Sequence, residues 1–294
     1  MTMGFPLGSR IYSKWKTGSV ILGTSSQIIV DSLHSFLKRN YSRDVDELNR
    51  LLAKSDSADL RPEAPPIPFT GNPWSKSKGE CTLLVGINPK WHEPGSKTGQ
   101  YESEILESIN LIDRFRDGNE ECFSKYLDQR KNYFREGFEY GGHFTYIANR
   151  FMENWYETDK NSLWEKYVFN MDILPWFSDK TKGISNEKLV FEYSRNEALL
   201  EYRVVIEGLI DLIKPKRIQL NGVPPRLVFQ DIFGIESEPL QLIDNSIGMY
   251  VGFLEIKNLR YPILAHNFGK TQAGPNSIPQ WEEMARKYSE WLSN

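Results

Sequence analysis

The sequence predicts an α/β protein of three layers, α/β/α, built on a central, mostly parallel four-stranded sheet, with a helical extension at the N-terminus. Three observations lead to this prediction. Short apolar runs that fit buried parallel strands recur along the chain, segments of helical periodicity separate them, and the runs end in glycine, proline or a polar residue. Helix and strand in alternation are typical of right-handed βαβ units.

The composition is that of an ordinary globular protein, with 294 residues, 26% of them charged and 39% hydrophobic. No apolar run reaches the roughly 18 residues of a membrane helix, and the N-terminus has no hydrophobic signal core, so we expect a cytoplasmic protein without membrane contact. The two cysteines, Cys81 and Cys122, are too few for a disulfide framework and are expected to be buried. A net charge of −3 argues against a histone-like DNA coat but allows a local basic rim.

Residues 1–60 are predicted to form the N-terminal helical extension, and residues 61–294 the α/β domain. Apolar side chains at helical spacing indicate two packed helices, one around Leu33 and one around Leu48. These helices either cap the core or bind a partner. The closely spaced prolines of residues 61–68 exclude a helix, which places the boundary there.

The first predicted strand begins at Cys81 and ends in Gly86, Asn88 and Pro89. Ligands of open α/β sheets bind beyond the carboxyl ends of the strands. Asn88 stands there between a permissive glycine and a rigid proline, so it is well placed for chemistry. The alternative is an ordinary turn after a strand.

Two helices are predicted next, at about 103–117 and 120–134. A glycine pair, Gly141 and Gly142, then leads into an aromatic helix. Glycines before a helix let the backbone approach a ligand closely, and Phe144 is the first aromatic ring that could cover a planar group. An aromatic helix of the core is the alternative.

The second buried strand spans residues 167–174 and carries Asn170 and Asp172. Side chains alternate along a strand, so these two point to the same face near its carboxyl end. Both need polar partners, and the edge of a nucleobase would supply them. For Asp172, a structural hydrogen bond to a neighbouring loop is the simpler explanation.

The remaining chain continues the alternation. A long helix ends before Pro215, a third strand covers residues 217–220, and a further helix begins at Pro224. A hairpin through residues 249–256 and 260–265 ends in His266, followed by a small polar loop and a terminal helix capped by Ser277. A lone histidine is more often structural, but at a strand end facing Asn88 it is a candidate for catalysis.

Together these stretches resemble the uracil-DNA glycosylase superfamily from about residue 78 to 292, and within it the mismatch-specific uracil and thymine glycosylases. Gly86-Ile87-Asn88-Pro89 resembles the first motif of that branch, whose Asn helps to position the hydrolytic water. Phe144 is similar to the aromatic residue that stacks on the flipped base, and Asn170 to the Asn that reads the base edge. His266 resembles the histidine that stabilises charge on the leaving base.

The sequence departs from the family pattern in three places. Lys90 stands where glycine commonly follows the proline. His266 is not followed by the usual Pro-Ser, so the wedge residue is either Phe268 or one farther along the chain. The segment between Asn88 and Phe144 is long and adds a helix pair, which indicates an unusual substrate. The candidate DNA contacts that follow these motifs are Lys90, Lys97, Asn267, Phe268 and Lys270.

The resemblance implies a monofunctional DNA glycosylase that flips a base out of double- or single-stranded DNA and hydrolyses its N-glycosidic bond, without metal or cofactor. The insertion favours a modified pyrimidine, such as glucosylated hydroxymethylcytosine of phage DNA in antiviral defence; uracil and mismatched thymine are the other substrates. The catalytic candidates are Asn88 and His266, and the substrate-binding candidates are Gly86, Ile87, Pro89, Phe144, Asn170 and Asp172. Two alternatives stay open, a catalytically inactive DNA-binding protein of the same fold and an α/β hydrolase of free nucleotides.

Overall fold

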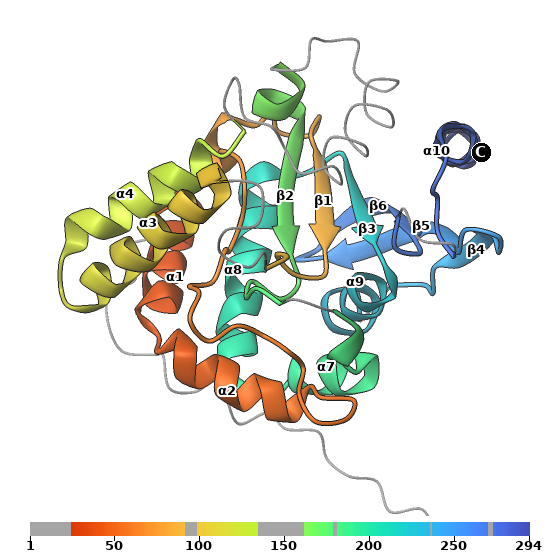
Figure 1. The fold of residues 1–294 in the computed structure, drawn as a ribbon. Helices are drawn as coiled ribbons and strands as arrows, with labels where there is room; N and C mark the ends of the chain where they lie inside the picture. Colours follow the sequence, from red (N-terminus) through yellow and green to blue (C-terminus); the bar gives the residue numbers. More distant parts are fainter. Residues whose placement is uncertain (1–24, 92–98, 135–161, 179–180, 236, 270–272) are drawn as a thin grey trace, which may run out of the picture.

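Helices surround a single sheet in the computed structural model, which describes residues 25–91, 99–134, 162–178, 181–235, 237–269 and 273–294 (Figure 1). The α-helices are α1 (Ser25–Lys38), α2 (Tyr41–Leu51), α3 (Gly99–Arg116), α4 (Glu120–Lys131), α7 (Asn186–Glu192), α8 (Glu197–Ile213), α9 (Val223–Val228) and α10 (Ile278–Ser293). The strands are β1 (Thr82–Gly86), β2 (Val168–Asp172), β3 (Arg217–Asn221), β4 (Gln241–Asp244), β5 (Met249–Ile256) and β6 (Leu259–His266). Short 3-10 or π-helical turns are η2 (Pro73–Ser75), η4 (Leu163–Tyr167), η5 (Thr181–Gly183) and η6 (Phe229–Phe233).

The strands form one mixed sheet in the order β2-β1-β3-β6-β5-β4. β2, β1, β3 and β6 are parallel neighbours, whereas β5 and β4 continue the sheet as antiparallel strands. The α/β class is confirmed, but the expected four-stranded sheet is wrong, because the described residues contribute six strands. β5 is the first arm of the expected hairpin, which the four-strand count left out of the sheet. β4 escaped prediction because its four residues are exposed or only partly buried and form no apolar run.

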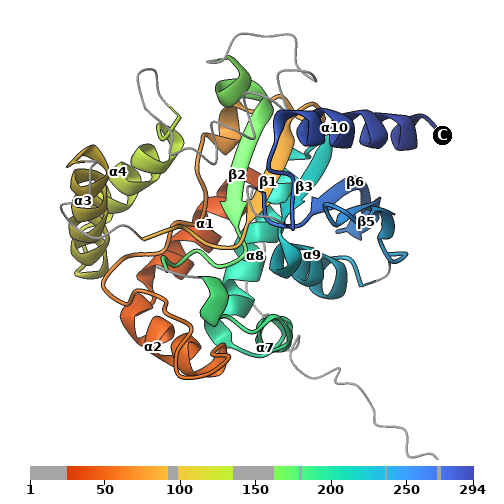
Figure 2. The ribbon, with the colours of Figure 1, turned by 45° about the vertical axis from the view of Figure 1, so that its right-hand side comes forward.

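Strand side chains divide between two cores, one on each face of the sheet. Leu83 and Val85 of β1 point into the main core, which α1, α2, α3, α4 and α8 cover. Leu84 points into the second core, which α10 covers through Trp281 and Tyr288 on the opposite side of the sheet (Figure 2). The three-layer prediction therefore holds for the parallel part of the sheet.

The two cysteines lie where the composition indicated. Cys81 and Cys122 are both free thiols buried in the main core. The described helices include none with the length and apolarity needed to cross a bilayer.

The N-terminal helices are part of the main core. α1 lies along α8, where Gly208 lets the side chain of Ile29 approach closely, and the ring of Phe36 stacks on Tyr202 with centroids 5.1 Å apart. Of the two roles left open for these helices, capping the core is therefore the one seen. The domain boundary near residue 60 stays a prediction.

Replacing Leu33 by alanine tests this packing. The side chain is fully buried on α1, so we expect its truncation to lower the free energy of unfolding by about 2–5 kcal/mol. Urea denaturation measures the loss, and Ile28→Ala, at a position 54% exposed on the same helix, is the matched control with an expected change under about 0.5 kcal/mol. Equal effects of the two variants would contradict the packing of α1 in the core.

Candidate active site at the carboxyl edge of the sheet

Polar residues lie in one row across the four parallel strands, on the face of the second core. Gly86 pairs with Asp172, and Asn221 pairs with His266. β1 and β3 pair in parallel up to Val85 and Leu220. The next residues of these strands, Gly86 and Asn221, are therefore neighbours as well, which connects the two pairs into one row. Since the four strands are parallel, this row lies at their common carboxyl edge, where ligands of α/β sheets bind. The sequence-predicted residues Gly86, Asp172 and His266 are thus brought together.

The loops that follow β1 and β2 are hydrogen-bonded side by side. The backbone N–H of Ile173 donates to Gly86 O at 3.1 Å, and that of Leu174 donates to Ile87 O at 2.8 Å. Farther along, Ser178 N donates to Pro89 O at 3.1 Å. These bonds hold the first motif against the loop after β2, so its geometry depends on both segments.

The amide of Asn88 is oriented by that second loop. Its Nδ2 donates to Trp176 O at 3.1 Å and to Ser178 Oγ at 2.7 Å. The backbone carbonyl can only accept, so the nitrogen must face Trp176, and the Oδ1 atom points the other way. Oδ1 is buried and accepts no hydrogen bond from any described residue. This oxygen is therefore a preoriented acceptor for a substrate or a water molecule.

Asp172 ends β2 with its carboxyl over the backbone of Gly86. A Cβ at position 86 would overlap the Asp172 Oδ1 atom, so only glycine leaves room for this carboxyl. The expected structural hydrogen bond is absent, because the carboxyl bonds to no side chain or backbone group in the part of the chain that the structure describes. Withdrawal from water raises the pKa of Asp172 from 3.8 to about 7.

Asn170 lies two residues before Asp172, on the same face. Its Nδ2 donates to Thr70 Oγ1 at 3.1 Å, and its backbone pairs with Thr70 as well. The side chain is buried and holds the segment around Thr70 against the edge of β2. Reading a base edge therefore requires a second hydrogen bond from the same amide.

Both ring nitrogens of His266 are engaged. Nδ1 lies 2.7 Å from Asn267 O, which can only accept, so this nitrogen carries a proton. Nε2 lies 3.0 Å from the side-chain amide of Gln219, so it is engaged as well. The ring is 2% exposed and meets Trp281 edge to face. In this arrangement His266 presents no N–H to a leaving base, and its expected role, which stays a prediction, requires Gln219 to move.

Two polar residues of β3 escaped the sequence analysis. Gln219 binds His266, and Asn221 accepts a hydrogen bond from Gly269 N at 3.1 Å, which ties the loop after β6 to the row. The signal for them was present, because Gln219 and Asn221 alternate with Ile218 and Leu220 just as Asn170 and Asp172 alternate with apolar neighbours.

Apolar side chains stand beside the row. The backbone of Gly222, with φ of 112°, lies between Ile87 and Phe268, whose nearest atoms are 3.5 and 3.7 Å from the position of a Cβ at 222. Ile87 is buried, whereas the ring of Phe268 is 39% exposed. Asn267 is held by its own loop, since Nδ2 donates to Ala273 O at 2.8 Å. The ring of Phe268 is thus accessible, and its role as a wedge stays a prediction.

The remaining candidates are exposed or lie outside the described residues. Lys90 is exposed just beyond Pro89. Phe144, Lys97 and Lys270 fall in the segments that the structure does not describe. In its described parts, the chain brings no three His, Cys, Asp or Glu side chains together as a metal site.

The inserted helices lie away from this row. Ile112 and Phe115 of α3 and Phe123 of α4 belong to the main core, on the other face of the sheet, and α3 contacts α1. Among the described residues of the insertion, Ile105 of α3 packs with Trp91 and Phe177 in the loops beyond β1 and β2. Beyond α4, burial raises the pKa of Tyr133 to about 12, and Asp172 raises it further. The helix pair itself therefore does not cover the polar row.

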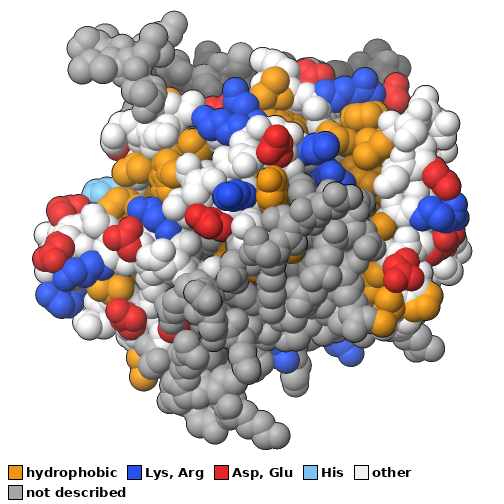
Figure 3. Space-filling model, turned by 90° about the horizontal axis from the view of Figure 1, so that it is seen from above, with side chains coloured by type: hydrophobic (Ala, Val, Ile, Leu, Met, Phe, Trp, Pro, Cys, Tyr) orange, Lys and Arg blue, Asp and Glu red, His pale blue; other side chains and the backbone are white. Residues whose placement is uncertain are grey.

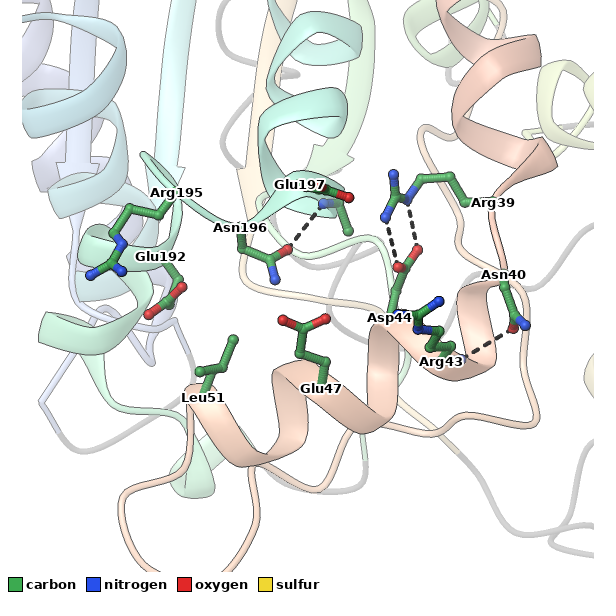
Figure 4. Close-up of a pocket in the computed structure, with 11 residues that line it drawn as sticks. Arg39, Asn40, Arg43, Asp44, Glu47, Leu51, Glu192, Arg195, Asn196 and Glu197 are labelled. Carbon is green, nitrogen blue, oxygen red and sulfur yellow. Dashed lines mark hydrogen bonds and ion pairs between the residues drawn. The ribbon is translucent and has the colours of Figure 1, made fainter. Parts of the chain in front are cut away.

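A separate groove of about 540 Å³ opens between α2 and the start of α8 (Figure 4). Its side chains include Arg39, Arg43 and Arg195 against Asp44, Glu47, Glu192 and Glu197. Arg39 is already bound to Asp44 through two hydrogen bonds of 2.7 Å. With four carboxylates against three guanidinium groups, the groove has no excess of positive charge for a polyanion. On the face seen in Figure 3, basic and acidic side chains are likewise interspersed among the described residues.

The raised pKa of Asp172 predicts how stability depends on pH. The folded protein keeps the proton up to about pH 7 and the unfolded chain releases it near pH 3.8, so wild-type stability falls as pH rises between these values. Asp172→Asn removes this loss, and at pH 8 we expect the variant to be more stable by about 4 kcal/mol. Denaturation at pH 4 and pH 8 measures it; a variant less stable than wild type at pH 8 would contradict the burial of this carboxyl.

No protein-family model matches the sequence, and a search of curated proteins found no match.

Proposed function

We propose that the protein is a DNA glycosylase whose active site is the carboxyl edge of β2, β1, β3 and β6. The observation that carries the proposal is the row formed by Asp172, Gly86, Asn221 and His266, with Asn88 directly beyond it. Polar side chains from three of the four strands, Asp172, Asn221 and His266, gather at one edge. Burying polar side chains is unfavourable unless they find hydrogen-bonding partners, and a bound ligand would supply such partners.

A flipped nucleobase suits the shape of this edge. Gly86 contributes no side chain to the row, and the carboxyl of Asp172 lies over its backbone, so a base bound here would meet that carboxyl. Ile87 and Phe268 offer apolar contact beside it, and Phe144 is the expected stacking partner. The exposed ring of Phe268 fits the wedge that replaces an extruded nucleotide in the stack.

Hydrolysis needs a water molecule held beneath the sugar carbon. Asn88 supplies an oriented acceptor, because its nitrogen is bound by the loop after β2 and its Oδ1 is not. An amide takes up no proton at accessible pH, so Asn88 contributes orientation rather than base catalysis. A modified pyrimidine is the proposed substrate, beside uracil and mismatched thymine.

One observation favours a second candidate, the catalytically inactive DNA-binding protein. Both nitrogens of His266 are engaged by Gln219 and Asn267, as a purely structural histidine would be. A binder of this kind would keep its affinity when Asn88 is replaced.

Cleavage of base-modified DNA tests the proposal. Purified protein is incubated with end-labelled single and double strands that carry uracil, mismatched thymine, hydroxymethylcytosine or its glucosylated form, and abasic sites are revealed by alkali. We expect cleavage at one base and a loss of about 100-fold in Asn88→Ala, because water is no longer positioned. Asn132→Ala, at an exposed asparagine after α4, is the control with wild-type activity. Absence of cleavage, with binding that Asn88→Ala retains, would establish the inactive binder instead.

Ser178 tests the orientation of Asn88 separately. Its hydroxyl accepts the 2.7 Å hydrogen bond from Asn88 Nδ2, so Ser178→Ala leaves the amide held less firmly. We expect kcat to fall about tenfold with little change in KM, because the loss is one of geometry in the reacting complex. Single-turnover rates measure this, and an unchanged kcat would show that the hydrogen bond does not position Asn88.

A further inference from the structure

The proposed reaction needs a donor for the departing base. Negative charge grows on that base as the N-glycosidic bond breaks, and a proton or a hydrogen bond must meet it. Both ring nitrogens of His266 are engaged, Nδ1 by Asn267 O and Nε2 by the side-chain amide of Gln219. Asn221 presents its Oδ1 to Gly269 N. Another group in the row must then supply the proton.

Asp172 is the row residue that can carry one. Its carboxyl lies over the backbone of Gly86, where it would face a bound base. The carboxyl forms no hydrogen bond with any described residue. Among the described residues, two tyrosines interact with Asp172: Tyr202 on α8, which donates to Asp172 O, and Tyr133 beyond α4. No described charged group contributes to the state of the carboxyl, which burial alone keeps protonated up to a pKa of about 7.

We propose that Asp172 is the general acid that protonates the departing base. This inference rests on the proposed glycosylase function and assigns one step of it. The C1′–N bond breaks with its electron pair on the base, and the base takes the carboxyl proton. The water held by Asn88 bonds to C1′ and releases its own proton to solvent. Asp172 is left ionised and recovers a proton from solvent, so the sum of the steps is the addition of one water molecule.

The opposite role for Asp172, a general base that activates the water, makes a different prediction. A base must be ionised, so its reaction would accelerate as pH rises through 7, whereas a reaction with a general acid slows. The pH profile of kcat therefore distinguishes the two directions of proton transfer.

The test uses the full-length protein and the base that the cleavage panel identifies. We expect wild-type kcat to fall tenfold per pH unit above about pH 7 and Asp172→Asn to be at least 100-fold slower, with no inflection near pH 7. Asp172→Glu keeps a carboxyl and should restore part of the rate. Asp211→Asn, at a partly buried aspartate on α8, is the control.

A leaving-group comparison separates acid catalysis from a structural defect. A 5-fluoropyrimidine departs as a more stable anion, so it needs less protonation, and the deficit of Asp172→Asn should shrink about tenfold or more on it. An equal deficit on both bases, or a wild-type kcat that rises through pH 7, would overturn the assignment while the glycosylase proposal stands. A wild-type protein that cleaves none of the bases would overturn the glycosylase proposal itself, and the acid with it.

Discussion

The alternation of side chains along four parallel strands is the constraint on which the candidate site depends. Because β2, β1, β3 and β6 are in register, residues of one parity enter the main core and residues of the other parity face the second core. At the carboxyl ends the second set is polar in β2, β3 and β6 and is glycine in β1. A slip of one residue in any of these strands would turn its polar residue into the main core, so the apolar pattern that fixes the register also assembles the site.

The loops beyond the strands extend this order by hydrogen bonds rather than by burial. Segments after β1 and β2 continue side by side past the end of the sheet, and Asn221 ties the loop after β6 to the same edge. Asn88 thus takes its orientation from residues 176 and 178, about 90 positions away in the chain. Local sequence around a motif is therefore not enough to place its side chain.

Features that belong to a single strand could be predicted from the sequence, whereas contacts between distant segments could not. Alternation within an apolar run located Asn170 and Asp172, and strand ends located Asn88 and His266, because these are properties of one strand at a time. The partners of each side chain depend on strand order, which pairs His266 with Gln219 and Asn170 with Thr70. The two antiparallel strands were also missed as part of the sheet, since β4 is too exposed to show periodicity and β5 was expected only as the arm of a hairpin.

The chemistry of the edge follows from how few charges it contains. Both ring nitrogens of His266 are bound by uncharged groups, Gln219 and Asn267 O, and Asn88 and Asn221 are amides. In such surroundings a carboxyl without a cationic partner keeps its proton, and Gly86 provides the space in which it stays unpaired. An aspartate in a neutral row becomes an acid at physiological pH, whereas an arginine nearby would have made it a permanent anion. Burial over Gly86 thus determines the protonation of Asp172, on which the proposed acid step depends.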